Sequence, residues 1–452
     1  MSEADGSGEP ARRLRILLVA YEFPPGPSPQ SLRWGYLTRH LCERGHEVHA
    51  MVPDISGDHD LRSLVDPRVR VHRINPGPVR SLLEALARRR PLPAMVDEGS
   101  QSPGRAGAGT HATAPPRLNW KGRSLGAVQA ALACVMFPDL RAEWLGPALA
   151  ALPGVLSHAR PDVVVASHEP ATSLQVALAA RARGFALVAD LGDPVLAPYT
   201  PWWWRRRARR LEARIMAAAR HVLVTSEATR ALLDSRHGGH VPISLVTQGF
   251  ERGPSPVQAA STPGSQGPLR LLYAGRFYPF RDPRPLVDAV LAVPGVQLDI
   301  ASGNVPDWLV ASAGRSGGRI RLLGRVPHGY LLGLQRTAHV LVNIANRDPV
   351  QVPGKVYEYL GADRPILHIT DTPDDAISAL LGGLRRGWSR PARVDALARQ
   401  LERLVVAHQA GVLEDGLDLT ARTVDPWSWA QAAGTVERAL LGAVDEPFPG
   451  AS

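Results

Sequence analysis

Cysteine is nearly missing from this chain of 452 residues, since Cys42 and Cys134 are the only two. Two thiols supply neither a disulfide framework nor a four-ligand zinc site, and a reducing compartment is the simplest interpretation. Long apolar runs are missing as well. The longest, Leu125–Phe137, is interrupted by Gln129 and is shorter than the roughly 20 residues that a membrane-spanning helix needs. No transmembrane helix is expected.

A secretory signal is also lacking, because the first residues carry Glu3, Asp5 and Glu9 and no apolar core. We expect a protein located in the cytoplasm or peripherally on the inner face of the cell membrane. Lysine is scarce too: Lys121 and Lys355 are the only lysines among 52 basic residues, a bias typical of GC-rich coding. The net charge of +10 favours anionic partners such as phosphates or anionic lipid. Nucleic acid is not expected, because zinc-finger ligands and RNA-binding signatures are missing.

One basic cluster is local and aromatic. Trp202, Trp203 and Trp204 are followed directly by Arg205 and Arg206. Tryptophan beside arginine suits a membrane interface, where the rings lie at headgroup depth and the cations contact anionic lipid. The alternative is a helix start with partly buried rings and a solvated basic face.

Short apolar runs alternate with helical stretches, which predicts parallel sheets flanked by helices. The runs predicted as strands are Ile16–Ala20, Glu47–Val52, Val69–Ile74, Val163–Ala166, Ala186–Leu191, Val222–Val224, Ile243–Val246, Leu269–Ala274, Val296–Ala301, Ile320–Leu323, Val340–Ile344 and Ile366–Ile369. The segment 251–268 has the composition of a linker and divides these strands into two groups. The sequence therefore predicts an α/β protein with two Rossmann-like, doubly wound domains that face each other across a cleft.

The expected boundaries follow from this pattern. They are a disordered tail at 1–12, an N-terminal domain at 13–250 with a mobile insertion at 97–118, the linker at 251–268, a C-terminal domain at 269–424 and a final helix at 425–445. Ligands of open α/β sheets bind at the carboxyl ends of the strands. Each domain is thus expected to offer one side of the cleft to a substrate.

Two loops after predicted strands are candidates for binding. The first strand leads into a Pro/Gly-rich loop with Gly26 and Ser28, followed by Arg33. This loop has no G-x-G-x-x-G fingerprint, but its backbone N–H groups suit an anion or a hydroxyl-rich ligand. The first strand after the linker leads into Gly275-Arg276, and Arg281 follows five residues on.

Two arginines at strand ends suit a diphosphate, which they bind through charge-assisted hydrogen bonds. Further along the chain, Gly354 and Lys355 start a predicted helix and Glu358 lies one turn into it. Gly354 and Lys355 add donors for the same anion, and Glu358 is suited to accept both hydroxyls of a ribose. Taken singly, the arginines are equally well explained as solvated surface and Glu358 as a helix-surface carboxylate.

In the order and spacing of these residues, the chain resembles the GT-B-fold glycosyltransferases of family 4. The C-terminal resemblance lies in Gly275-Arg276, Arg281 and the segment Lys355-Val-Tyr-Glu-Tyr-Leu-Gly-Ala-Asp-Arg-Pro365. The N-terminal half resembles one branch, through Phe23-Pro24-Pro25, Arg33, Gly45-His46, Phe137-Pro138-Asp139, Trp144, Ser167 to Pro170 and Ala189 to Pro194. The tryptophan-rich terminal helix is similar to the family's cross-over helix. The chain departs from many relatives at Val350, where they carry a first glutamate, and at Gly192 and Val195 beside Asp193.

The resemblance implies a hexosyltransferase (EC 2.4) that moves a sugar from a nucleotide-diphosphate donor to an acceptor hydroxyl with retention. It implies donor binding by Gly275, Arg276, Arg281, Gly354, Lys355 and Glu358. Asp193, Arg276 and Arg281 are the implied catalytic residues. Gly26, Ser28, Arg33 and His168 are implied on the acceptor side. Polysaccharide, glycolipid or natural-product acceptors are all compatible.

No metal or other cofactor is expected, because basic side chains take the place of a metal in such folds. Asp58-His59-Asp60 formally matches an Asp-x-Asp metal motif, but it lies in a polar loop. Two alternatives remain: a GT-B-fold sugar-nucleotide epimerase, which needs no acceptor, and a non-catalytic membrane- or nucleic-acid-binding relative.

Overall fold

The structure is a computed structural model, and it describes residues 12–57, 59–82, 137, 140–198, 200–253, 267–278, 281–346, 354–372 and 375–445. The predicted insertion at 97–118 lies outside the described residues, as do most of the predicted tail and the middle of the predicted linker. So do Cys134 and Val350. Within the described part of the chain, no helix is both long and apolar enough to cross a membrane.

The first sheet has seven parallel strands in the order β3-β2-β1-β4-β5-β6-β7. The strands are β1 (Arg15–Ala20), β2 (Glu47–Pro53), β3 (Arg70–Ile74), β4 (Val163–His168), β5 (Ala186–Leu191), β6 (His221–Val224) and β7 (Ile243–Leu245). The helices around it are α1 (Pro29–Glu43), α2 (His59–Arg62), α5 (Leu145–Ala159), α6 (Thr172–Arg181), α7 (Arg205–Ala218) and α8 (Glu227–His237), with a 3-10 turn at Leu140–Trp144.

The second sheet has six parallel strands in the order β10-β9-β8-β11-β12-β13. They are β8 (Leu269–Ala274), β9 (Val296–Ala301), β10 (Ile320–Gly324), β11 (Val340–Ile344), β12 (Ile366–Ile369) and β13 (Gly387–Arg390). Its helices are α9 (Arg284–Ala292), α10 (Asp307–Arg315), α11 (His328–Thr337), α12 (Lys355–Leu360), α13 (Ala376–Gly383) and α14 (Val394–Gln409). The two sheets confirm the predicted fold class of two doubly wound α/β domains.

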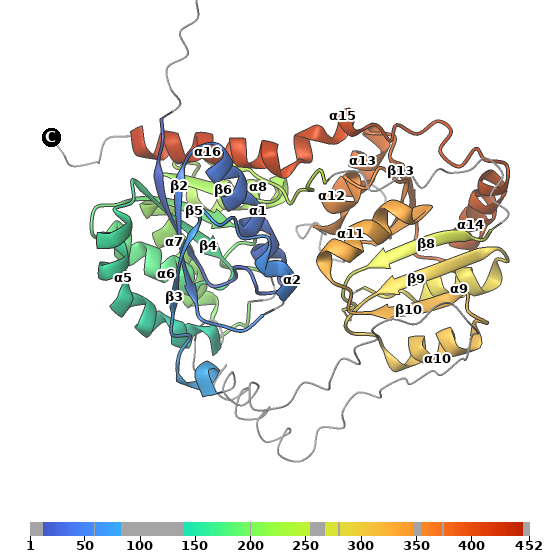
Figure 1. The fold of residues 1–452 in the computed structure, drawn as a ribbon, viewed down its shortest axis with the longest axis horizontal. Coiled ribbons are helices and arrows are strands. Elements are labelled where there is room, and N and C mark those ends of the chain that lie inside the picture. Colours follow the sequence, from blue (N-terminus) through green and yellow to red (C-terminus); the bar gives the residue numbers. More distant parts are fainter. Residues whose placement is uncertain are drawn as a thin grey trace, which may run out of the picture.

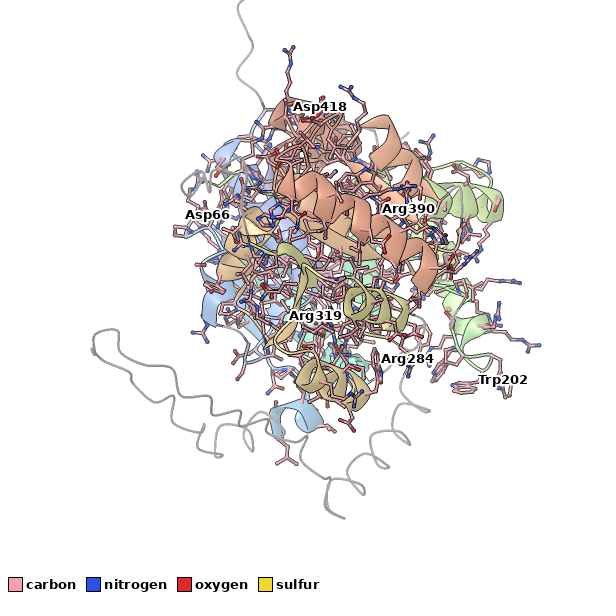
Figure 2. The ribbon with its side chains drawn as sticks, turned by 90° about the vertical axis from the view of Figure 1, so that its right-hand side faces the viewer. Asp66, Trp202, Arg284, Arg319, Arg390 and Asp418 are labelled. Carbon is pink, nitrogen blue, oxygen red and sulfur yellow. The ribbon has the colours of Figure 1, made fainter. Side chains whose placement is uncertain are left out.

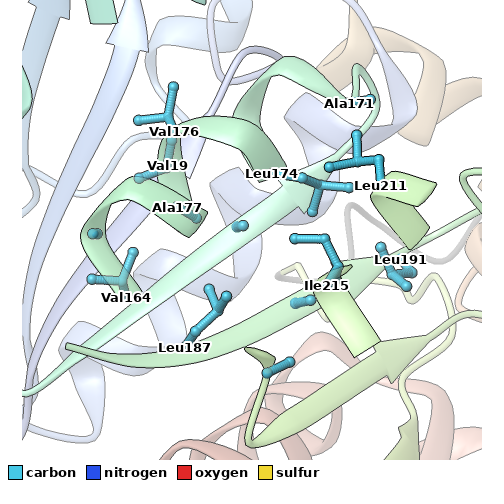
Figure 3. Close-up of a cluster of buried hydrophobic side chains, with 14 of the residues drawn as sticks. Val19, Val164, Ala171, Leu174, Val176, Ala177, Leu187, Leu191, Leu211 and Ile215 are labelled. Carbon is cyan, nitrogen blue, oxygen red and sulfur yellow. The ribbon is translucent and has the colours of Figure 1, made fainter. Parts of the chain in front are cut away.

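Buried aliphatic side chains on both faces of the central strands explain why these segments form parallel strands, which helices cover on both sides. In the first domain Val164 of β4 and Leu187 of β5 pack against Leu174 of α6 and Ile215 of α7 (Figure 3). Strand β13 was not predicted, because its sequence Gly-Trp-Ser-Arg is only half-buried and has no apolar run. Its position at the sheet edge relaxes the need for one.

Helix α1 illustrates how local sequence fixes an element beside the site. Ser28 caps it by accepting a hydrogen bond from the backbone N–H of Ser31, and Pro29 occupies its first position. Gly45 follows the helix with φ +93°, a left-handed conformation that glycine adopts without strain. The helix therefore begins directly after the loop that follows β1.

The chain crosses between the domains twice. After β7 it passes through Phe250 into the C-terminal domain, and after α14 it returns through α15 (Ala421–Val424) and a 3-10 turn (Asp425–Trp427) into α16 (Trp429–Asp445). The two crossings are joined where Phe250 bridges to Ser428 and its carbonyl accepts a hydrogen bond from the Trp429 N–H. Helix α16 then lies along the N-terminal domain, at the top of Figure 1.

The packing of α16 explains its position. Trp429, Ala433, Val436 and Leu440 are buried, and they belong to the same apolar cluster as Leu37 of α1. Removing apolar surface from water stabilises this arrangement by about 25 cal/mol for each Å² buried. Helix α16 therefore makes the last segment of the chain part of the N-terminal domain.

Candidate functional site

Each sheet has one point where the strand order reverses, and these points locate the candidate site. In the first sheet β1 lies between β2 and β4, so the loops after β1 and β4 diverge; in the second the same holds for β8 and β11. Ligands of open α/β sheets bind in the crevice at such a reversal, beyond the carboxyl ends of the strands. The predicted donor and acceptor residues follow these four strands or lie beside them.

In the C-terminal domain, Arg281 spans the reversal. Its guanidinium donates to the side-chain oxygen of Asn346, which follows β11, and lies 3.4 Å from the backbone oxygen of Arg276, which follows β8. The guanidinium carbon is 5.6 Å from the centre of the Tyr278 ring. The Arg281 Nε is buried and has no hydrogen-bond partner among the described residues. A buried donor without a partner at a strand reversal is a position where a ligand oxygen is expected.

Arg276 and Gly275 complete this side of the reversal. Arg276 is exposed, so its guanidinium is accessible to a ligand. The Gly275 N–H donates to the Ala301 carbonyl, and a methyl group added at Gly275 would meet the Tyr273 hydroxyl at 3.4 Å and Arg281 at 3.8 Å. A side chain at position 275 would thus occupy the space beside Arg281.

Helix α12 is tied to the same edge of the sheet. The Tyr359 hydroxyl accepts a hydrogen bond of 3.0 Å from the backbone N–H of Ala274, the last residue of β8. Charges on both Glu358 and Arg281 act on Tyr359, whose pKa is raised mainly by burial. The predicted donor residues from β8 and α12 are therefore brought together.

Glu358 is the centre of a polar cluster. One of its carboxylate oxygens accepts hydrogen bonds from Lys355 Nζ at 2.9 Å and from the side-chain amide of Gln335 on α11. The other lies 3.9 Å from His328 Nδ1, also on α11. Burial alone would raise the pKa of Glu358, but Lys355, His328 and Gln335 together lower it. Glu358 is therefore a carboxylate at neutral pH.

The N-terminal reversal carries Gly26, Ser28, Gln30 and His168. Gly26 closes a turn by donating from its N–H to the Phe23 carbonyl at 2.9 Å, and Ser28 is occupied as the cap of α1. Gln30 Nε2 donates to the His168 carbonyl at 2.8 Å, which joins the loop after β1 to the end of β4. The oxygen of the Gln30 amide and His168 Nδ1 are buried without a partner among the described residues.

His168 is a neutral imidazole in this structure. Burial lowers its pKa from 6.5 to about 4, and the opposing effect of nearby Asp193 is smaller. Asp193 follows β5 and is half-buried. His168 and Asp193 are thus close enough to interact. A neutral imidazole beside a carboxylate is able to orient a hydroxyl group.

Arg33 requires a correction. The sequence assigned it to the acceptor side, but its side chain is fully buried in the N-terminal domain. Its Nε and one terminal nitrogen donate to the two carboxylate oxygens of Asp190, and the other donates to the Val246 and Thr247 carbonyls. Because its side chain is fully buried and bonded within the N-terminal domain, Arg33 supports the start of the crossing to the C-terminal domain and is not available to an acceptor.

The tryptophan–arginine cluster divides into two parts. Trp202 and Trp203 are 79% and 48% exposed, and Trp202 projects from the edge of the molecule in Figure 2. Trp204 instead packs edge-on against Phe137 with a centroid distance of 5.3 Å. Arg205 and Arg206 are exposed on the first turn of α7. Two of the three rings, together with these arginines, are accessible to a partner, and the third anchors the segment.

Among the described residues, no group of three or more histidine, cysteine, aspartate or glutamate side chains is arranged to hold a metal ion. Asp58 of the Asp-x-Asp match lies outside the described residues. A cavity of about 480 Å³ lies at the two crossings, lined by residues that include Thr247, Trp427 and Gln431. None of the residues that line this cavity is among those assigned to the two strand reversals.

The sequence did not point to Gln30, His328, Gln335 and Asn346. Asn346 had a usable signal, because it is a polar residue two positions after the buried run Val340–Ile344. Gln30, His328 and Gln335 lie on helices and match no motif, so only their tertiary contacts identify them.

Comparisons with known proteins bear on the family and the fold. Residues 112–252 match the family described as Glycosyltransferase Family 4, which is less than half of the chain. The curated protein sequences give no match. Among solved structures, sucrose-phosphate synthase from Thermosynechococcus elongatus is similar with a TM-score of 0.61 at 17% identity, covering 96% of this chain and 100% of that one.

Two further structures extend the comparison. AviGT4, a glycosyltransferase involved in avilamycin A biosynthesis, has a TM-score of 0.52 at 14% identity and covers 96% and 99% of the two chains. A UDP-N-acetylglucosamine 2-epimerase has a TM-score of 0.51 at 13% identity, with 95% and 96% covered. At these identities the likeness shows the fold alone, which is the GT-B fold. The expected activity class, a glycosyltransferase, agrees with both the family match and the fold.

Proposed function

We propose that this protein is a hexosyltransferase that moves a sugar from a nucleotide-diphosphate donor to an acceptor hydroxyl with retention of configuration. The observation that carries the proposal is the buried, unpartnered Arg281 Nε at the C-terminal strand reversal, beside Gly275 and α12. A diphosphate oxygen is the ligand that satisfies such a donor, because a charge-assisted hydrogen bond replaces a costly unpaired group.

Within this proposal each residue has a chemical role. Arg276 and Arg281 hold the diphosphate and stabilise the negative charge that develops as the bond to the sugar breaks. Lys355 adds positive charge nearby, and Glu358 accepts hydrogen bonds from the ribose. The new bond forms between the acceptor oxygen and the anomeric carbon, and the acceptor proton passes to the leaving phosphate. No metal is required in this scheme.

On the acceptor side, we assign the orientation of the hydroxyl to His168 and Asp193, with Gly26 and Ser28 shaping the loop and Gln30 joining it to β4. The acceptor is a glycan, a lipid-linked sugar or a small molecule. A lipid-linked acceptor fits a peripheral position on an anionic membrane surface, held by Trp202, Trp203, Arg205 and Arg206. Their exposure supports this part of the proposal.

The test is calorimetric titration of the purified protein with UDP, GDP, dTDP and ADP, with and without magnesium. We expect one nucleotide to bind independently of magnesium, and Arg281→Met to weaken its binding. Binding of none of the four would contradict the proposal and favour a non-catalytic relative. The matched control is Arg284→Met. Arg284 is the exposed first residue of α9, three positions after Arg281, and it pairs with Asp282.

The epimerase alternative is separated by product analysis. A transferase releases the nucleoside diphosphate only when an acceptor is present or water replaces it. An epimerase instead converts the donor into a second nucleotide sugar without any acceptor. Appearance of that isomer would exclude the transferase assignment.

A further inference from the structure

Tyr36 connects the N-terminal domain to the donor side of the site. Its ring stacks on Trp429 of α16, with centroids 5.5 Å apart and planes 13° from parallel. Its hydroxyl lies 3.1 Å from Nε2 of His328, the first residue of α11 in the other domain. Because α1 and α16 are both packed in the N-terminal core, the hydroxyl is a fixed point for the C-terminal domain to contact.

His328 continues the connection to Glu358. Its Nδ1 faces the Glu358 carboxylate at 3.9 Å, and both side chains are nearly buried, with 12% and 13% of their surface exposed. Lys355 and Gln335 occupy the other carboxylate oxygen. Neither Lys355 nor Gln335 donates to the oxygen that faces His328.

The Glu358 carboxylate opposite Nδ1 selects the direction of the hydrogen bond, because it can accept a proton from the imidazole but cannot donate one. Burial raises the pKa of Tyr36 well above its usual range, so the phenol keeps its proton. Burial lowers the pKa of His328, so the imidazole is neutral at pH 7. A phenol that donates to Nε2 leaves the imidazole proton on Nδ1, where it faces Glu358. The Tyr36 hydroxyl thus donates to His328, and the Nδ1–H of His328 points towards the Glu358 carboxylate.

We propose that Tyr36 and His328 are positioning residues that orient the Glu358 carboxylate for the donor and couple donor binding to the contact between the two domains. This inference rests on the proposed function, because it deepens the role of the same site. Any ligand that binds Glu358 must bind the oxygen facing His328 or displace Lys355 or Gln335. Donor binding and the Tyr36–His328 contact therefore act on the same carboxylate.

Thermodynamic linkage makes the coupling reciprocal. If the contact favours the donor-binding arrangement of Glu358, removing the Tyr36 hydroxyl weakens nucleotide binding in the other domain. A hydrogen bond contributes about 0.5–1.5 kcal/mol, which corresponds to a change in affinity of about two- to twelvefold. Phenylalanine at position 36 keeps the stack on Trp429, so this change isolates the hydroxyl.

The experiment measures the dissociation constants of UDP, GDP, dTDP and ADP for the full-length wild type and then follows the bound nucleotide in variants. We expect Tyr36→Phe to weaken binding by about three- to tenfold, and His328→Phe to weaken it more. His328→Asn, which restores a donor near the Nδ1 position, is expected to recover part of the loss. The matched control is Tyr330→Phe, since Tyr330 lies on the same helix α11 and is 65% exposed.

A double-mutant cycle separates positioning from a general structural role. In a Glu358→Gln background, Tyr36→Phe is expected to have little further effect on nucleotide affinity, while an additive loss would overturn the coupling. A second outcome would also overturn the coupling: Tyr36→Phe binds nucleotide with wild-type affinity while Glu358→Gln binds it more weakly. That outcome leaves the proposed function standing. A wild type that binds none of the four nucleotides overturns the proposed function and the coupling together.

Discussion

Arg33 and Asp190 form a doubly hydrogen-bonded ion pair at the centre of the N-terminal domain, with both side chains fully buried. The Trp34 indole N–H donates to the same carboxylate at 2.9 Å. Arg33 also holds the Val246 and Thr247 carbonyls at the start of the crossing between the domains. The pair therefore joins α1, β5 and the first crossing at one buried point.

We expect Asp190→Asn to destabilise the protein by about 3–5 kcal/mol, because it leaves the Arg33 charge buried without its counter-charge. The measurement is the thermal and denaturant unfolding of the variant against wild type. Arg230→Met, which removes one partner of an exposed pair with Glu227, is the control and should change stability by less than about 1 kcal/mol. Equal effects of the two substitutions would contradict the structural role given to Arg33.

Arg281→Lys tests whether the geometry of the guanidinium matters or only its charge. Lysine keeps the charge but lacks the planar guanidinium, which donates to Asn346 and at the same time presents its Nε to a ligand. We expect nucleotide affinity to fall by about tenfold or more in Arg281→Lys, close to the loss in Arg281→Met. Wild-type affinity in the lysine variant would mean that the site needs only a positive charge. Calorimetry is the measurement.

The buried neutral His168 predicts a dependence of stability on pH. Its pKa is about 4 in the folded protein, below the 6.5 of an unfolded chain, so the unfolded state binds more protons between these values. Stability from this residue is therefore present above pH 6.5 and is lost as the pH falls towards 4. The full effect is up to about 3 kcal/mol.

The measurement compares unfolding of wild type and His168→Gln from pH 4 to pH 7.5. We expect the variant to show a weaker loss of stability on acidification, since glutamine does not titrate. Using the difference between the two proteins removes the contribution of other histidines with lowered pKa, such as His339. Parallel pH profiles would show that His168 is not neutral in the fold.

Replacing Trp202 and Trp203 together by serine tests the membrane part of the proposal. Both rings are exposed, so we expect the fold to be kept while co-sedimentation with vesicles of anionic phospholipid falls several-fold. Tyr330→Ser removes an exposed aromatic ring from the other domain and is the control. Unchanged sedimentation of the tryptophan variant would identify the cluster as a solvated helix start.

Much of the fold was predictable because buried parallel strands are continuous apolar runs. The bounds of β5, β8, β9, β11 and β12 agree with the runs read from the sequence. Strand β13 was missed because an edge strand needs no such run. The motifs around Gly275, Arg276 and Lys355 are local in the chain, so the sequence alone predicts a donor side, and that assignment stays a prediction. Arg33 was placed wrongly, because a sequence motif does not tell whether a charged side chain has a buried counter-charge.

The sequence by itself determined which segments form strands β1 to β12, because these depend on local apolar runs, and its short motifs predicted which residues carry the donor-site chemistry. Tertiary structure alone decided which polar groups meet. Asp190 reaches Arg33 across 157 positions of sequence, and Tyr36 reaches His328 across 292. Such pairs follow from strand order and from the packing of α16 on the other domain. Local composition carries no information about either.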